Sequence, residues 1–280
     1  MTVAKEFAPA KVNLTLHVTG QREDGYHLLD SLVMFADVGD RITVRPSDTP
    51  IMIIKGPMAD GLPRDRTNMV ARAADAMGVS AHIQLEKNLP HAAGIGGGSS
   101  DAAATFRALS EISGKPIPDD LLAFGADVPV CMHGQAARMQ GIGNDIHSLP
   151  DLPALHAVLV NPKLPVLTAE VFKCLRKHDN AAMPDDLPVG ASARELINWL
   201  SEMRNDLQDA AIEAEPIIAH VFNTLAVTPG CLLTRMSGSG GTCFGLYGDA
   251  ETAASAAGRL NQDYPGWWVA ATKLNAARTN

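Results

Sequence analysis

The amino-acid sequence predicts an α/β fold, more narrowly α+β, from three features of its hydrophobic pattern. Apolar and polar residues alternate at 12–19 and again at 79–86, which is the period of a β-strand. A glycine-rich loop and a helical pattern follow the second strand directly. The second half reads strand, three helices, two strands, helix and strand, an order that suits helices packed on one face of a mainly antiparallel sheet.

Composition limits the class of protein. The chain has 280 residues, enough for a sizeable core in one or two domains, and a formal charge of −8. This charge argues against a general nucleic-acid surface, which is normally basic. No uncharged apolar run approaches the length of a membrane span, and the N-terminus lacks the apolar core of a signal peptide. We therefore expect a cytoplasmic protein with no nucleic-acid or membrane partner.

Cysteine usage agrees with a reducing compartment. The four cysteines are widely spaced and form no CxxC pair, which favours reduced thiols over a zinc site or a disulfide framework. They are Cys131, Cys174, Cys231 and Cys243.

The glycine-rich stretch at 89–104, LPHAAGIGGGSSDAAA, carries the clearest chemical signal. Gly94, Gly96, Gly97 and Gly98 precede two serines and an alanine-rich helical pattern. Serine is a favoured N-cap, so Ser99 or Ser100 is predicted to open the helix. A flexible loop that leads into a helix N-terminus presents unpaired N–H groups to an anion, and phosphate is the usual one.

A plain turn and two other kinds of phosphate-binding loop are the alternatives for this stretch. Glycine clusters often form only tight turns. A Walker A loop is excluded because no lysine of the chain precedes Ser or Thr. The dinucleotide fingerprint also fails, because Ser99 stands where its last glycine belongs. The four glycines and two serines at a helix start favour phosphate binding.

The remaining elements follow from periodicity and breakers. Further strands are predicted at 28–35, 41–45, 51–55, 128–132, 136–140, 157–160, 232–236, 242–247 and 267–274. Helices are predicted at 68–77, from 118, at 168–177, from 192, from 205 with an interruption at Pro216, and from 249. A Pro-rich turn at 151–153 is the candidate boundary between domains 1–150 and 151–280.

Three single features have an ordinary alternative to a functional role. Lys11 begins the strand at 12–19, and a surface lysine is the default expectation. Tyr26 and His27 directly follow a charged loop. They are expected either to stack on a planar base or to form a partly buried structural pair. Asp127 lies among small and apolar residues, where Asp is common as a turn or cap residue.

Three stretches taken together resemble the motifs of one kinase superfamily. They are PAKVNL at 9–14, PHAAGIGGGSSDA at 90–102 and MSGSGGTCF at 236–244. They resemble the three motifs of the galacto-, homoserine, mevalonate and phosphomevalonate (GHMP) kinases. GQREDGYH at 20–27, GADVPV at 125–130 and NDL at 205–207 sharpen the resemblance toward the branch with a cytidyl substrate. Tyr26 with His27 and the stretch at 125–130 disfavour mevalonate or homoserine as substrate.

The resemblance implies a two-domain GHMP kinase fold with the active site in the cleft between the domains. It implies ATP-dependent phosphorylation of the 2-hydroxyl of 4-diphosphocytidyl-2-C-methyl-D-erythritol, giving the 2-phosphate and ADP, in non-mevalonate isoprenoid biosynthesis. ATP is then the co-substrate and Mg²⁺ the metal, and the protein is expected to be a monomer or a weak homodimer.

The resemblance also implies site residues. Lys11 and Asp127 match the catalytic pair, and Ser100 is the candidate Mg²⁺ ligand. The residues that match ATP-binding positions are Asn68, Lys87, Pro90, His91, Ala92, Ala93, Gly94, Ile95, Gly96, Gly97, Gly98, Ser99 and Ser100. The residues that match substrate-binding positions are Asn13, Tyr26, His27, Asp127, Thr168, Phe172, Gly238 and Ser239.

The physical chemistry of the pair suits these roles. A hydroxyl is a poor nucleophile, and a positioned carboxylate such as Asp127 can accept its proton. A neighbouring ammonium such as Lys11 keeps that carboxylate ionised and offsets charge on the transferred phosphoryl group. A loose transition state needs little help from a base, and the alternative role for Asp127 is mainly to orient the hydroxyl. Sequence does not separate these two roles.

The sequence departs from the family pattern at two places, and two other functions are disfavoured. His91, Ala92 and Ala93 replace a more glycine-rich lead, and the segment at 114–125 is short, which puts local geometry in question. A nucleotide-binding regulator without phosphoryl transfer is disfavoured because Lys11 and Asp127 are both present. An NAD-dependent oxidoreductase is disfavoured by the failed fingerprint.

Overall fold

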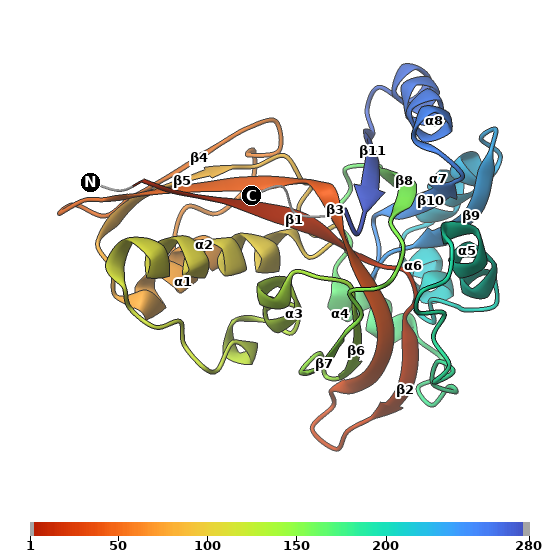
Figure 1. Cartoon of the computed structure of the whole chain (residues 1–280), viewed down its shortest axis with the longest axis horizontal. Coiled ribbons are helices and arrows are strands. Elements are labelled where there is room, and N and C mark those ends of the chain that lie inside the picture. The colour runs from red at the N-terminus through yellow and green to blue at the C-terminus, as the bar shows by residue number, and fades with distance from the viewer. Residues whose placement is uncertain (1–2, 277–280) are drawn as a thin grey trace. The chain divides into compact units, whose positions relative to one another are not determined.

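The structure is a computed structural model that describes residues 3–276 (Figure 1). The chain forms two compact units that interleave along the sequence. The first unit comprises Met1–Lys11, Val38–His91 and Gly96–Gly134, and the second comprises Val12–Asp37, Ala92–Ile95 and Gln135–Asn280. The domains 1–150 and 151–280 drawn from the sequence are a different division and stay a prediction.

The first unit packs helices on one face of a sheet. Its sheet pairs β4 (Ile51–Lys55) in parallel with β5 (Ala81–Glu86), and β5 antiparallel with the C-terminal half of β3 (His27–Pro46). Strand β1 (Ala4–Asn13) also pairs with β3. The helical elements are α1 (Met69–Met77), α2 (Gly97–Ser113), the 3₁₀ turn η1 (Leu122–Phe124) and α3 (Val128–His133).

Figure 1 shows α1 and α2 side by side below these strands. The core between them buries apolar side chains from both layers. It includes Ile42 and Ile83 from the sheet, and Val70 and Phe106 from the helices. Lys87 directly follows the last residue of β5, and the glycine-rich loop leads from there to the start of α2.

The second unit has a larger antiparallel sheet. Strands β11 (Trp268–Leu274), β8 (Leu155–Asn161), β10 (Cys243–Tyr247) and β9 (Cys231–Met236) are neighbours in that order. The first part of β3 pairs with β2 (His17–Gln21) and β6 (Ala137–Gly141), and β6 pairs with β7 (Asp145–Ser148). The helices are α4 (Thr168–Cys174), α5 (Ala193–Ser201), α6 (Gln208–Ala214), α7 (Ile217–Ala226) and α8 (Ala250–Asp263).

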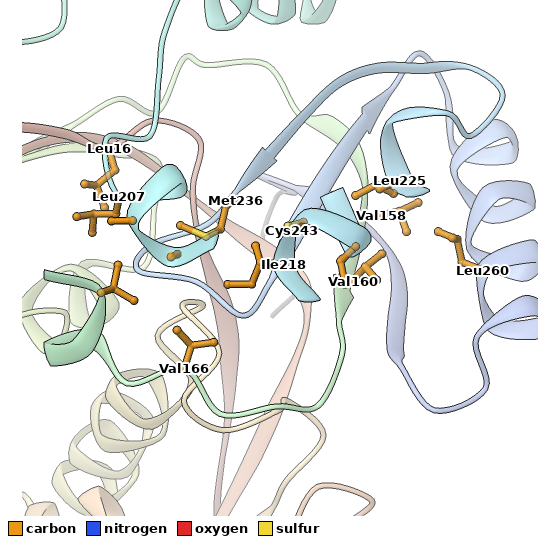
Figure 2. Close-up of a cluster of buried hydrophobic side chains, with 14 of the residues drawn as sticks. Leu16, Val158, Val160, Val166, Leu207, Ile218, Leu225, Met236, Cys243 and Leu260 are labelled. Carbon is orange, nitrogen blue, oxygen red and sulfur yellow. The ribbon is translucent and has the colours of Figure 1, made fainter. Parts of the chain in front are cut away.

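One apolar cluster packs α4, α6, α7 and α8 against the sheet, and Figure 2 shows part of it. Val158 and Val160 of β8 meet Ile218 and Leu225 of α7, and Leu260 of α8 closes the cluster from the side. Mixed sheets with packed helices confirm the predicted α/β class. No helix within residues 3–276 combines the length and the apolar character needed to cross a membrane.

Local signals predicted several boundaries correctly. Asn68 caps α1, with its side chain accepting a hydrogen bond from the N–H of Val70, and Gly78 ends the helix in the left-handed conformation. Ser192 and Glu195 form the predicted capping box. The helix break at Pro216 is also present, between α6 and α7.

Three predicted elements are wrong. The strand at 128–132 is the helix α3, because a short apolar run fits either structure and Pro129 suits the first turn of a helix. The helix expected from 118 is reduced to η1. The strand at 12–19 is interrupted between β1 and β2.

Two further expectations about burial and capping are also wrong. The polar residues Asn13, Thr15 and His17 are buried together with their apolar neighbours, so the segment is not half-exposed. Helix α2 begins at Gly97, with Gly96 as its N-cap, so neither Ser99 nor Ser100 opens it. Gly96 adopts the positive φ of 62° at this position, which a serine adopts only with strain.

Candidate active site

Lys11 and Asp127 form an ion pair in the first unit. Lys11 lies on β1, and Asp127 immediately precedes α3. The Nζ atom of Lys11 lies 3.0 Å from Oδ2 of Asp127, and the two side chains are 4% and 30% exposed. Lys11 is therefore no surface lysine, and Asp127 remains reachable from solvent.

The glycine-rich loop packs directly over this pair. A Cβ on Gly96 would lie 3.1 Å from Cε of Lys11 and 3.7 Å from Oδ2 of Asp127. No side chain caps α2 at Gly96. The first N–H groups of this 17-residue helix thus carry the positive end of its dipole without a side-chain acceptor, beside the ion pair.

A second, fully buried set of charges lies beneath the start of α2. The Nζ atom of Lys87 lies 2.5 Å from Oδ2 of Asp40 and 2.7 Å from Oδ2 of Asp101. The other oxygen of Asp40 accepts hydrogen bonds from the N–H groups of Asn88 and Leu89. We call Asp40, Lys87 and Asp101 the buried triad. It connects β3, the beginning of the glycine-rich loop and α2.

The buried triad holds one ammonium between two carboxyl groups. Burial raises the pKa of Asp101 to about 8, although Lys87 opposes the shift. Burial alone would lower the pKa of Lys87, but Asp101 and Asp40 together outweigh it and raise that pKa. Lys87 therefore stays charged, and Asp101 readily holds a proton. A Cβ on Gly97 would lie 3.2 Å from Nζ of Lys87, so the triad supports the first residue of α2.

The other predicted ATP-binding residues of the first unit differ in their contacts and burial. Asn68 uses Oδ1 to cap α1 and Nδ2 to bond the carbonyl of Pro63. Ser100 is buried, and its Oγ atom has no hydrogen-bond partner within the described residues. Pro90 is also buried, whereas His91 is exposed. Contacts of any of these with ATP stay a prediction.

The second unit brings the third motif against residues 92–95. Oγ of Ser237 donates to the carbonyl of Gly94 and accepts from the N–H of Asn13. A Cβ on Gly238 would lie only 2.6 Å from the carbonyl oxygen of Gly94. The two backbone segments can approach this closely because residue 238 is glycine. Oγ of Ser239 lies 2.7 Å from Oγ1 of Thr168. The predicted residues Asn13, Gly94, Thr168, Gly238 and Ser239 thus form one group.

The neighbouring residues of the loop are held by backbone bonds. Ala92 adopts a positive φ of 48°, and its carbonyl accepts from the N–H of Val166. The carbonyl of Ala93 accepts from the N–H of Thr242, and Ile95 is buried.

An aromatic group stands elsewhere in the second unit. The rings of His27 and Phe172 stack with centroids 4.4 Å apart and planes 19° apart. Nε2 of His27 lies 2.8 Å from Nδ1 of His178. Burial, and then the nearby His178, lowers the pKa of His27, which favours the neutral ring. Tyr26 is 62% exposed and so presents its ring to solvent.

Sequence reasoning missed four residues that support these groups. These residues are Asp40, Asp101, Ser237 and His178. Three of them contact residues that are far away in the sequence, whereas Asp101 contacts Lys87 across the glycine-rich loop. Only Asp101 and Ser237 carried a signal, because both lie inside recognised motifs. Asp40 and His178 lie outside every motif.

Comparison with known proteins decides the family. The family model for the GHMP kinases N terminal domain matches residues 67–144, and that for GHMP kinases C terminal matches residues 190–266. A protein of Dinoroseobacter shibae is 52% identical over 96% of this chain and 94% of its own length. The chain belongs to the GHMP kinase family. The resemblance predicted from the motifs is confirmed, and the chain is an ATP-dependent kinase.

Relatives of this GHMP kinase carry a common name. The protein of Dinoroseobacter shibae and one of Cereibacter sphaeroides, 51% identical over 97% of this chain and 99% of its own length, are both named 4-diphosphocytidyl-2-C-methyl-D-erythritol kinase. A crystal structure of 4-(cytidine 5'-diphospho)-2C-methyl-D-erythritol kinase matches with a TM-score of 0.79 at 33% identity, over 98% of this chain and 100% of the other. Homoserine kinase from Cytophaga hutchinsonii, with a TM-score of 0.66 and 19% identity over 98% of this chain and 94% of its own, shares the fold.

Proposed function

We propose that this GHMP kinase transfers the γ-phosphoryl group of ATP to the 2-hydroxyl of 4-diphosphocytidyl-2-C-methyl-D-erythritol. The products are ADP and the 2-phosphate, and the reaction belongs to non-mevalonate isoprenoid biosynthesis. The names of the relatives support the substrate. The observation that carries the chemistry is the 3.0 Å ion pair of Lys11 and Asp127 beneath Gly96.

In the proposed reaction, the Asp127 carboxylate takes the proton of the substrate hydroxyl. The O–H bond breaks, the hydroxyl oxygen bonds to the γ-phosphorus, and the bond from that phosphorus to the β,γ-bridging oxygen breaks to release ADP. Lys11 pairs with this carboxylate and offsets negative charge on the transferred group. If the transition state is loose, Asp127 contributes mainly by orienting the hydroxyl.

The glycine-rich loop is the proposed cradle of the ATP phosphates. Backbone N–H groups at 96–99 and the uncapped start of α2 favour an anion there. We propose that Asn68 and Lys87 lie near the adenosine, as the resemblance implies. Their side chains are already occupied by a helix cap and by the buried triad, so we expect them to act by shaping the site.

Mg²⁺ is the proposed metal, and few protein ligands are available to it. No group of three or more His, Cys, Asp or Glu side chains among residues 3–276 forms a metal cage. This fits an ion held mainly by substrate phosphates and water. Ser100 is the proposed protein ligand, because its buried Oγ atom lacks a partner among the described residues. When bound, Mg²⁺ supplies charge neutralisation at the phosphates.

The second unit supplies the proposed substrate contacts. His27, Phe172 and the exposed ring of Tyr26 offer flat surfaces and a ring nitrogen to cytosine. Thr168 and the group around Gly238 and Ser239 offer hydroxyl and backbone donors to the phosphates. Asn13 is proposed to contact substrate as well.

We propose a cytoplasmic location and a monomer or weak homodimer. The four cysteines are all free thiols, which supports a reducing compartment. The formal charge of −8 supports the absence of a nucleic-acid partner.

The test is ADP release by the purified chain with ATP and Mg²⁺. The cytidyl substrate, mevalonate and homoserine are compared at equal concentration. Turnover of the cytidyl substrate alone is expected. Turnover of another alcohol overturns the substrate assignment, and ATP binding without turnover of any of the three makes the chain a nucleotide-binding regulator.

A further inference from the structure

His27 and His178 share one hydrogen bond through ring nitrogens. Nε2 of His27 and Nδ1 of His178 are 2.8 Å apart, and the ring centroids are 5.0 Å apart with planes at 26°. Both residues are partly buried. No motif of the sequence includes His178.

Both histidines are fixed to the β2–β3 hairpin. His27 is the first residue of β3 and pairs with Gln21 of β2. The segment after α4 that carries His178 is fastened two residues later, where Asn180 donates through its N–H to the carbonyl of Val18. The distance between the rings is therefore set by backbone anchoring on one hairpin rather than by two flexible side chains.

A hydrogen bond between two neutral imidazoles fixes the position of a proton on each ring. If Nε2 of His27 carries the hydrogen, Nδ1 of His178 accepts it, and Nδ1 of His27 is left with a lone pair. If Nδ1 of His178 carries the hydrogen instead, Nδ1 of His27 becomes a donor. Burial and the neighbouring His178 lower the pKa of His27, which keeps this ring in a neutral form.

We propose that His178 is a positioning residue for base specificity: it holds His27 with Nε2 protonated and Nδ1 as an acceptor, so that the site selects cytosine over uracil. The inference rests on the proposed cytidyl substrate. Cytosine presents an exocyclic amine that donates a hydrogen bond, whereas uracil presents a carbonyl oxygen at the same place. An acceptor on His27 satisfies the amine and faces the uracil oxygen without a hydrogen between them.

The first arm of the test needs no substrate. Nitrogen-15 NMR of histidine-labelled protein reports which ring nitrogen of His27 is protonated. Wild type is expected to show Nε2 protonated and Nδ1 unprotonated, and His178→Ala is expected to show a mixture of tautomers. A wild-type His27 protonated at Nδ1, or an unchanged tautomer in His178→Ala, overturns the proposal. Because this arm uses no ligand, failure of the proposed function does not disturb it.

The second arm compares kcat/KM for the cytidine substrate with that for its uridine counterpart. His178→Ala is expected to lower the cytidine-to-uridine ratio about tenfold, the effect of one neutral hydrogen bond. His178→Asn is the rescue variant, because its amide oxygen can accept from Nε2 of His27, and it is expected to keep most of the ratio. His147→Ala is the matched control, since His147 is a solvent-exposed histidine of the same unit.

If His178 has only a structural role, the two kcat/KM values should change in a different way. Loss of folding or of packing lowers kcat/KM for both substrates together and leaves their ratio unchanged, and that result contradicts the proposal. If His178→Ala does not fold, the ratio in His178→Asn and the wild-type NMR spectrum decide. Equal use of cytidine and uridine substrates by wild type also contradicts it, even if the kinase reaction itself is verified.

Discussion

Nζ of Lys11 lies 3.0 Å from Oδ2 of Asp127, and only 4% of the lysine side chain is exposed against 30% of the aspartate. The cation is thus the buried member of the pair, and the carboxylate is the member that solvent and ligands reach. This asymmetry suits a carboxylate that contacts a substrate hydroxyl on its exposed side and pairs with the lysine on its buried side.

The pair is expected to act as a unit in catalysis. Lys11→Met and Asp127→Asn should each lower kcat by about 10²-fold or more, and the double variant should lose little beyond the worse single change. A double-mutant cycle on kcat measures this coupling. Asp119→Asn, an exposed carboxylate of the same unit, is the control and should leave kcat unchanged. Fully additive losses would mean that the two residues act independently.

Gly96→Ala should impair ATP use because of contact, not only strain. The new Cβ would lie 3.1 Å from Cε of Lys11, whereas a Cβ on Gly114, at the other end of α2, meets nothing within 4 Å. Both glycines have positive φ, of 62° and 68°, so both variants carry a similar strain of about 1 kcal/mol. We expect kcat/KM for ATP to fall about 10²-fold in Gly96→Ala alone. An equal fall in kcat/KM in Gly114→Ala would show that backbone strain alone explains the loss in Gly96→Ala.

Lys87→Met should destabilise the fold strongly. It leaves the carboxyl groups of Asp40 and Asp101 buried without their cation, and breaking such a set costs about 3–5 kcal/mol. The free energy of unfolding in urea, measured without ATP, checks this. Lys55→Met is the matched control, because Lys55 is 52% exposed and should change stability by less than about 1 kcal/mol. A Lys87 variant as stable as the Lys55 variant would show that the buried triad does not stabilise the loop.

Protonation of Asp101 should make the free energy of unfolding depend on pH. Its pKa rises from 3.8 in the unfolded chain to about 8 in the folded protein. Between these values the folded state binds the extra proton, so this residue makes the free energy of unfolding fall as pH rises from about 4 to about 8. Asp101→Asn should remove that component and give a flatter profile over this window. The same slope in wild type and variant would exclude the assignment.

His27→Ala should raise the KM for the cytidyl substrate far more than the KM for ATP. The ring that stacks on Phe172 is lost, and with it the nitrogen proposed to meet the base. Steady-state kinetics with each substrate varied in turn measures both constants. Equal increases in both KM values would undermine the cytosine-site assignment, and His147→Ala again serves as the control.

Signals that act within a few residues were readable from the sequence. The cap at Asn68, the capping box at Ser192 and the helix break at Pro216 each depend on local backbone chemistry. The glycine-rich loop followed by a helix was equally readable, although the first helical residue is Gly97 rather than a serine. Here the left-handed conformation at Gly96 decided the boundary.

Long-range contacts were beyond the sequence pattern. Nothing near Lys11 indicates burial, because its partner Asp127 stands more than a hundred positions away. Asp40 and Lys87 likewise meet only through the pairing of β3 with β5. The segment at 128–132 shows the same limit, since its apolar run fits a strand or a helix until the packing is known.

A single-turnover measurement on Asp127→Asn tests the catalytic role of this carboxylate most directly. Enzyme in excess, ATP, Mg²⁺ and the cytidyl substrate are mixed and quenched, and the 2-phosphate formed is quantified against time; ATP affinity is measured separately by calorimetry. We expect ATP to bind as in wild type while the rate of phosphoryl transfer falls by about 10²-fold or more. A transfer rate equal to that of wild type would remove Asp127 from the chemistry and contradict the proposed site.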